Sequence, residues 1–488
     1  MQKFFLLTPK NYSYYCHRVG GVQVASTNYG GLGLVASTAL SSNDIVVQVP
    51  SQLVLDVTSP NDGNKDILAL FRDEQVYRSL PWFAQLSLRL NALDKGLIYG
   101  GLPKKPWLDA LPRKFDTPIH WREGSKNELQ YSFMRDGVKF QDTNWKNMYD
   151  DVVSAMNPEF SKVLAYDDFV WGCECARSRA FSGAYAGSAF NPAPYAFTLL
   201  LVTLYVGLNM GTIEQAANGA GIVFCANIWK DFVIPKFFKS KKYVICPFID
   251  MANHVSSNES GDVAFEYFGD SYSLTMKRGV QEGSEVFISY GARSNDQLLQ
   301  YYGFVETDNP HDVYIMPALR EWDIDALEKA CGFSFGSDRL LKIDRAGLLG
   351  NDNISSSEDS GNENGDVDDV KTRGGIIVSR AGGLDPAVMQ ALRAMVSDEK
   401  EWTEAGEAVG NFAAEVSQKN EKLARLAAVT ELRAELAKKA TSIEEDEKLL
   451  KQLQCSKSLV TSDEELLAIK FRIEKKKLLQ EEIIKLQQ

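Results

Sequence analysis

Four short segments combine residue types that can bind a cofactor or take part in catalysis. They are GGLGLVA at 30–36, RSRAF at 177–181, PFIDMANH at 247–254 and EVFISYGARSNDQLLQYYGF at 285–304. Glycines without a side chain let the backbone approach a ligand closely, and a guanidinium fork suits a carboxylate. The glycine segment lacks the spacing and the following helix of a dinucleotide fingerprint, which argues against that kind of binding loop.

Each segment taken alone also has a structural explanation. Glycines between strands usually form a turn, and an arginine such as Arg179 on a helix usually makes a surface ion pair. Asn253 and His254 could be a turn followed by a core histidine. Tyr290 and Tyr302 could be packed aromatics in a chain that has 19 tyrosines. The functional prediction therefore depends on all four segments occurring together.

The order of the segments resembles the SET-domain family. A Gly-x-Gly after the first strand is followed by SRAF, D-x-x-N-H, S-Y-G with S-N, and Y-G-F. More narrowly, the chain resembles the Rubisco large-subunit methyltransferase branch. The C-terminal runs TSIEEDEKLL and FRIEKKKLL also resemble the substrate-binding domain of that branch. The resemblance implies an α+β fold in which a threaded, knot-like SET β domain carries a helical insert and an all-α domain follows it.

The same resemblance implies a role for individual residues. Tyr290 is expected to be the catalytic tyrosine. Residues expected to bind S-adenosylmethionine are Gly31, Leu32, Gly33, Arg179, Asn253, His254 and Phe304, with Phe304 against the adenine. Residues expected around the substrate channel are Phe181, Asp250 and Tyr302. No metal is expected.

Methyl transfer is consistent with these residue types. The reaction is an in-line displacement at a carbon carried by a sulfonium, so alignment supplies much of the rate. A lysine acceptor must arrive as a neutral amine although its ordinary pKa is about 10.4, and a desolvating channel lowers that pKa. Aromatic walls tolerate both the amine and its methylated cation.

The patterns around the segments indicate which elements position them. Short β-branched runs predict strands in 20–60 and again in 243–304, and 65–180 has helical periodicity. After 375 every segment reads as helical. Asp385-Pro386 predicts a helix start, and Ser442 to Glu445 and Ser462 to Glu465 read as capping boxes.

These elements give the expected domain boundaries. The two parts of the SET domain occupy 1–60 and 246–305, and a helical insert at 61–245 contains an apolar hairpin at about 184–240. The substrate-binding domain begins in 306–349 and continues as helices in 376–488. Between these parts, 350–375 is polar and acidic, which predicts a disordered linker.

The apolar segment 184–240 and the chain start depart from the family pattern. The favoured interpretation of 184–240 is a helical hairpin packed on the SET core, and the alternative is a surface that faces a membrane or a partner. The N-terminal stretch lacks the helix that commonly precedes the first SET strand. It resembles neither a secretory signal nor a clear transit peptide, so an intracellular protein of undetermined compartment is expected.

Composition restricts the classes of partner. The formal net charge of -12 argues against nucleic acid, because phosphate binding needs clustered lysines and arginines. The 7 cysteines form no CxxC pair, so neither a zinc cluster nor a disulfide framework is expected. We expect a monomer that acts on a protein substrate.

The expected activity is methylation of lysine on a non-histone protein. Two alternatives stay open: a histidine methyltransferase of the same fold, and a catalytically silent SET module that binds proteins. Phe181 favours lysine, because the histidine branch has an amide side chain near this position. The sequence leaves the identity of the substrate and the number of methyl groups open.

Overall fold

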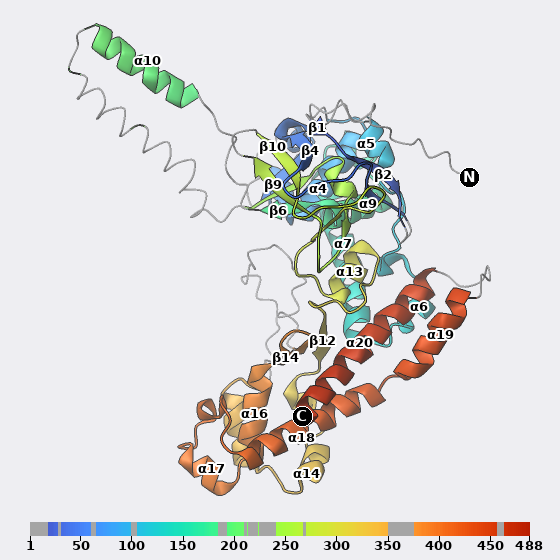
Figure 1. The fold of residues 1–488 in the computed structure, drawn as a ribbon, viewed down its shortest axis with the longest axis vertical. Coiled ribbons are helices and arrows are strands. Elements are labelled where there is room, and N and C mark those ends of the chain that lie inside the picture. Colours follow the sequence, from blue (N-terminus) through green and yellow to red (C-terminus); the bar gives the residue numbers. More distant parts are fainter. Residues whose placement is uncertain are drawn as a thin grey trace. The chain divides into compact units, whose positions relative to one another are not determined.

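The computed structural model describes most of the chain, which divides into two compact units. The described residues are 18–27, 31–59, 65–98, 105–183, 193–208, 212, 223, 241–266, 270–349, 375–455 and 463–488. The first unit comprises Met1–Lys114 and Trp145–Tyr290, and the second comprises Phe115–Asn144 and Gly291–Gln488. Each unit is therefore built from two separate stretches of sequence (Figure 1).

Short strands grouped in small sheets form the β part of the first unit. They are β1 (Arg18–Val19), β2 (Val22–Ser26), β3 (Leu32–Ala36), β4 (Ile45–Pro50), β5 (Leu55–Ser59), β6 (Phe181–Gly183), β7 (Lys241–Ile245), β8 (Asn253–His254), β9 (Gly261–Glu266), β10 (Ser271–Met276) and β11 (Phe287–Ile288). The sheet orders are β1-β4-β10-β9, β2-β3, β5-β7-β6 and β11-β8. The strands predicted in 20–60 and 243–304 are confirmed.

The helices of the first unit pack beside these sheets. They are α2 (Lys65–Leu68), α3 (Glu74–Ser79), α4 (Trp82–Asp94), α5 (Lys105–Ala110), α8 (Pro158–Ser161), α9 (Tyr166–Arg179) and α10 (Ala193–Gly207), with 3-10 turns at Ser51–Leu53 and Ile249–Met251. Helices α4 and α9 lie close together because Gly172 has no side chain to push against Ser87 and Asn91. Asn91 Nδ2 donates to Asp168 O at 2.9 Å, which fixes the pair. This packing positions Arg179 at the end of α9.

Helix α10 is the described part of the apolar segment 184–240. Its large apolar side chains lie on the surface, with Phe197 60% and Leu199 68% exposed. None of the side chains described in 196–208 is buried. The second half of the predicted hairpin lies outside the described residues, apart from single positions. Among the described helices, none is long and apolar enough to cross a membrane.

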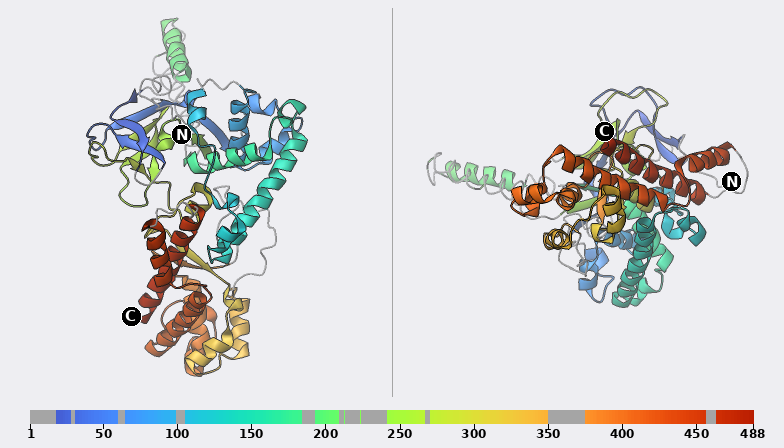
Figure 2. Two further views of the ribbon diagram at one scale, coloured as in Figure 1. Left: turned by 90° about the vertical axis from the view of Figure 1, so that its right-hand side faces the viewer. Right: turned by 90° about the horizontal axis from the view of Figure 1, so that it is seen from below.

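The second unit is mainly helical. Its elements are α6 (Glu123–Asn127), α13 (Asn295–Tyr302), β12 (Val313–Met316), α14 (Ile324–Cys331), α15 (Ser337–Arg345), β13 (Ile376–Ser379), β14 (Gly383–Leu384), α16 (Pro386–Val396), α17 (Glu399–Glu404), α18 (Gln418–Ala437), α19 (Ile443–Cys455) and α20 (Asp463–Gln487), with 3-10 turns at Pro118–His120, Leu319–Glu321 and Val409–Phe412. The long helix α7 (Ser132–Ala155), drawn in teal in Figure 2, contributes residues to both units. The core includes Tyr131, whose ring centroid lies 4.7 Å from that of Tyr314 and 6.1 Å from that of Phe471.

Local capping predictions are confirmed where the structure describes them. Asp385 is the N-cap of α16 and accepts from Ala387 N at 2.9 Å, with Pro386 in the first turn. Ser442 and Glu445 form the reciprocal bonds of a capping box, at 2.8 and 3.2 Å. Ser462 lies outside the described residues, as does nearly all of the predicted linker at 350–375.

One expectation for the C-terminal region is wrong. Residues after 375 are not wholly helical, because β13 pairs antiparallel with both β12 and β14. The segment IIVS of β13 is rich in β-branched residues and alternates buried with partly buried positions, which suits a strand. The C-terminal region is therefore helical with one small sheet.

Candidate active site

The predicted glycine loop is described from Gly31 onward, where it leads into β3. Gly31 has a φ of +86°, a conformation that residues with a Cβ rarely adopt. At Gly33 a Cβ would lie 2.5 Å from Glu285 Oε1 and 2.7 Å from Asn253 Nδ2. Glycine at 33 therefore lets two side chains from distant segments reach the backbone of β3. Gly30 lies outside the described residues.

Asn253 connects this backbone to Glu285. Its Nδ2 donates to Glu285 Oε1 at 2.6 Å and to Leu32 O at 3.3 Å. Burial raises the pKa of the Glu285 carboxyl, and the hydrogen bond from Asn253 opposes this effect. Sequence reasoning missed Glu285, since nothing in its neighbourhood identifies its partner.

His254 and Tyr290 meet where strands β8 and β11 pair in parallel. The register places His254 opposite Ile288. Tyr290 N donates to His254 Nδ1 at 3.0 Å, and the two rings stack with centroids 4.9 Å apart. The Tyr290 hydroxyl donates to Ala252 O at 2.8 Å. The predicted catalytic tyrosine is thus fixed at both its backbone and its hydroxyl.

Arg179 holds the buried carboxylate of Asp250, which lies just before strand β8 in the sequence. Its Nη1 donates to Asp250 O at 3.0 Å and to Asp250 Oδ2 at 3.2 Å. The Asp250 side chain is 0% exposed, and burial raises its pKa against the opposing effects of Arg179 and Trp107. Phe248, two residues earlier, has a φ of +75°, which is unusual for a bulky residue and marks the sharp turn that delivers Asp250.

Trp107 is a second contact that sequence reasoning did not find. Its Nε1 donates to Asp250 Oδ2 at 3.4 Å across 143 positions of sequence. The ring is almost fully buried on helix α5. A tryptophan in a predicted helical segment indicates core packing, so the sequence offers no signal for this contact.

The remaining predicted residues divide between the units. Phe181 begins β6, pairs with Val244 of β7 and is partly exposed. Tyr302 and Phe304 belong to the second unit, on either side of Gly303, the left-handed cap of α13. Their ring centroids lie 6.3 Å apart. The structure therefore groups Gly31 to Gly33 with Asn253, His254 and Tyr290, and Arg179 with Asp250.

Comparisons with known proteins match the C-terminal region by sequence and most of the chain by fold. Residues 345–479 match the family model described as Rubisco LSMT substrate-binding. Solved structures of the SET domain of LSMT bound to lysine and AdoHcy superpose with a TM-score of 0.56 at 19% identity, covering 96% of this chain and 87% of theirs. This likeness establishes the fold.

Curated relatives include enzymes that act on different residues. The Rubisco large subunit N-methyltransferase of Pisum sativum is 23% identical over 306 residues, which is 60% of this chain and 49% of that protein. The aldolase-lysine N-methyltransferase of Arabidopsis thaliana is 22% identical over 300 residues, 59% of this chain and 48% of that protein. The actin-histidine N-methyltransferase of Danio rerio is 20% identical over 302 residues, 60% of this chain and 40% of that protein. The chain spans about half the length of the first two relatives.

The chain has the fold of the SET domain of LSMT, and its C-terminal segment matches the Rubisco LSMT substrate-binding model. More narrowly, the chain is similar to the Rubisco large-subunit methyltransferases, as its motif order predicts.

Proposed function

We propose that the protein transfers a methyl group from S-adenosylmethionine to a lysine side chain of a non-histone protein. The observation that carries this proposal is the parallel pairing of β8 with β11, which brings Tyr290 onto His254, the neighbour of Asn253. A relative named as an aldolase-lysine N-methyltransferase and a solved neighbour bound to AdoMet support the class of reaction.

The residues present suit the cofactor. Among the described residues, no atom lies within 4 Å of the place where a Cβ of Gly31 would stand, so the backbone there can approach a ligand. Arg179 Nε is buried and has no hydrogen-bond partner among the described residues. Its N–H is therefore left to donate a hydrogen bond to a carboxylate. We assign the methionine end of S-adenosylmethionine to these groups, with Asn253 and His254 beside it. When bound, this cofactor supplies an electrophilic methyl group.

The hydroxyl oxygen of Tyr290 can accept hydrogen bonds from the reacting groups. Because its hydroxyl hydrogen is donated to Ala252 O, the oxygen lone pairs are left to accept from an amine or from polarised methyl hydrogens. This orientation aligns a neutral amine with the methyl group, and alignment is the main demand of an in-line displacement. The Asp250 carboxylate accepts hydrogen bonds from Arg179 and Trp107, so it orients Arg179 and is not assigned to the acceptor amine.

Lysine is proposed ahead of histidine because an aromatic residue, Phe181, stands at the SRAF position. Aromatic faces stabilise methylated ammonium groups. The matched substrate-binding segment at 345–479 supports a protein as the acceptor. The actin-histidine relatives make histidine methylation the alternative that the experiment must separate.

The test incubates the full chain with labelled S-adenosylmethionine and a lysate of its source cells. We expect Tyr290→Phe to lower labelling by about 100-fold or more, as loss of one aligned polar group in an active site does. Tyr149→Phe is the matched control, because Tyr149 also donates its hydroxyl to a backbone carbonyl, that of Leu164 at 3.0 Å. Hydrolysis of the labelled protein should release methyl-lysine.

Other results would reject parts of the proposal. Release of methyl-histidine in place of methyl-lysine would mean that histidine is the acceptor. Equal labelling by wild type and Tyr290→Phe would remove the tyrosine from the mechanism. Absence of S-adenosylhomocysteine binding in calorimetry would favour the silent binding module.

A further inference from the structure

Helix α10, drawn in green in Figure 1, exposes large apolar side chains over more than half of its circumference. Leu199, Leu200 and Leu201 are 68%, 53% and 49% exposed. Successive residues of a helix point about 100° apart, so these three leucines face three directions. Phe197 and Leu204, also exposed, lie between Leu200 and Leu201 around the helix. An apolar stripe that faces a protein core usually covers a narrower arc.

The composition of α10 suits an apolar medium. Its 15 residues, APYAFTLLLVTLYVG, include no charged side chain. Thr203 Oγ1 donates to Leu199 O at 2.8 Å, so this hydroxyl hydrogen has its partner within the helix. The backbone groups of a helix also bond within the segment, which is why helices can lie in hydrocarbon. Helix α10 can therefore leave water at little cost in unsatisfied polar groups.

The sequence after α10 changes from uncharged to basic. Between 180 and 229 the one charged residue is Glu214, whereas 230–242 has five lysines against a single acid, Asp231. The lysines are Lys230, Lys236, Lys239, Lys241 and Lys242. Lys242 forms an ion pair with Asp56 at 2.7 Å, and residues 230–240 lie outside the described residues. The other four lysines place positive charge next to the apolar segment, in a chain whose net charge is -12.

These two features favour a lipid surface over a protein groove as the partner of α10. A groove covers one face of a helix, whereas acyl chains can cover all of its sides. Lysines that flank an apolar segment are attracted to anionic lipid head groups. The described helix is about 22 Å long at 1.5 Å per residue, and the hydrocarbon core of a bilayer is about 30 Å thick. A helix of this length reaches into one leaflet.

We propose that α10 anchors the protein to a membrane surface that contains anionic lipids. The apolar side chains of α10 enter the acyl region of one leaflet, and the lysines at 230, 236, 239 and 241 contact the head groups. The anchor uses no residue of the candidate active site, so it is independent of the proposed function.

The test is flotation of the full chain with lipid vesicles. One set is phosphatidylcholine alone, and the other contains about one third phosphatidylserine, which supplies the anionic charge. We expect the wild type to float with the anionic vesicles, and less of it to float as salt screens the lysines. Leu199→Gln together with Leu204→Gln should weaken partitioning by about 100-fold, about tenfold for each leucine kept out of the acyl region.

Two further variants separate the helix from the lysines. Leu341→Gln is the matched control, because Leu341 on α15 is 53% exposed, and this variant should float as the wild type does. Lys236→Gln with Lys239→Gln should weaken binding to the anionic vesicles by about tenfold and leave binding to neutral vesicles unchanged. A urea midpoint equal to that of the wild type shows that each variant is folded.

Three results would overturn the proposal. The first is a wild type that floats with neither set of vesicles. The second is flotation of the double leucine variant equal to that of the wild type, because another part of the chain would then hold the lipid. The third is a concentration-dependent dimer in sedimentation without vesicles that the double leucine variant loses, which would assign these leucines to a second copy of the chain.

Discussion

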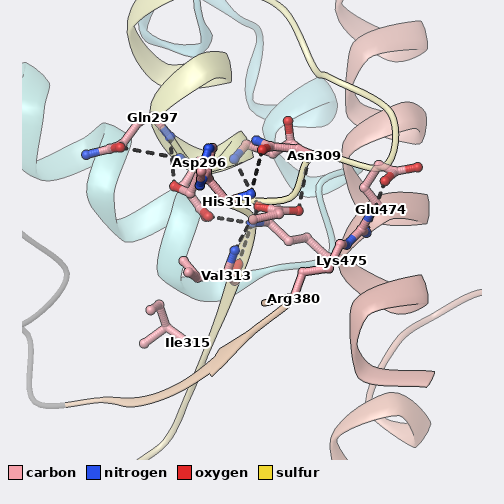
Figure 3. Close-up of polar contacts among 12 residues, drawn as sticks. Asp296, Gln297, Asn309, His311, Val313, Ile315, Arg380, Glu474 and Lys475 are labelled. Carbon is pink, nitrogen blue, oxygen red and sulfur yellow. Dashed lines mark hydrogen bonds and ion pairs between the residues drawn. The ribbon is translucent and has the colours of Figure 1, made fainter. Parts of the chain in front are cut away.

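In helices α10 and α20 the hydrophobicity of the residues does not match the burial of their side chains. In α10 the residues are almost all apolar, yet Phe197, Leu199 and Leu204 are exposed. In α20 the charged residues Arg472, Glu474, Lys475 and Lys476 are buried, and Figure 3 shows Glu474 and Lys475 with their polar contacts. A ranking by hydrophobicity alone would place α10 inside and the middle of α20 outside.

The difference shows that partners decide where a charged helix can lie. Arg472 Nη2 lies 2.7 Å from Asp446 Oδ1, and Lys476 Nζ lies 2.6 Å from Asp446 Oδ2. Asp446 itself is fully buried on α19. Charges can be buried when each has a hydrogen-bonded counter-charge, so α20 contacts its neighbours through ion pairs as well as through apolar side chains.

The largest effect that tests this contrast is expected from Arg472→Met. Removing one partner of a buried ion pair costs about 3–5 kcal/mol when the other charge is left uncompensated; because Lys476 still faces Asp446, we expect a loss at the lower end of that range, about 3 kcal/mol. Urea denaturation should show the loss in the transition of the second unit. The exposed Lys470→Met should change stability by less than about 0.5 kcal/mol. An equally small change for Arg472→Met would mean that its ion pairs contribute nothing to folding.

A smaller effect is expected from acid. Burial alone would raise the pKa of Asp446, but hydrogen bonds from Arg472 and Lys476 outweigh burial and lower it. Its contribution to stability is therefore complete above the unfolded pKa of about 3.9, and it is lost as the pH falls through the lower folded pKa. The difference in urea midpoint between wild type and Arg472→Met should narrow below about pH 4. A constant difference from pH 7 to strong acid would contradict this assignment.

The smallest effect is expected on α10. Leu199→Gln and Leu204→Gln replace exposed side chains and should shift stability by less than about 0.5 kcal/mol each. The same measurement on Leu432→Gln, at a buried position of α18, should show a loss of several times that size. A large loss for the α10 variants would place these leucines under cover in the folded protein and support the hairpin packed on the SET core.

Local signals in the sequence predicted much of the fold because their causes are local. Asp385 and Ser442 act on backbone groups within one helical turn, and both caps are confirmed. Strands β13 and β14 were missed because a four-residue and a two-residue strand are too short for a periodicity to appear. The pairing of β13 with β12 also depends on residues more than a helix away in sequence.

The candidate site divides in the same way. Gly33, Asn253, His254 and Tyr290 were found because several motifs occur in a set order, and the structure groups them. Trp107 and Glu285 were missed because each belongs to the site only through one partner that is distant in sequence. That partner is Asp250 for Trp107 and Asn253 for Glu285. The roles of the grouped residues in binding and catalysis stay predictions.

The interleaving of the two units has a consequence for synthesis on the ribosome. Residues 115–144 are made early, but they belong with helices of the second unit that are made much later. Arg472 of α20 donates to Glu128 O at 3.0 Å across 344 positions of sequence. At ordinary translation rates this separation is a wait on the order of tens of seconds. During that wait apolar residues such as Leu129 and Met134 lack their final partners, so this segment of the nascent chain is a natural target for chaperones.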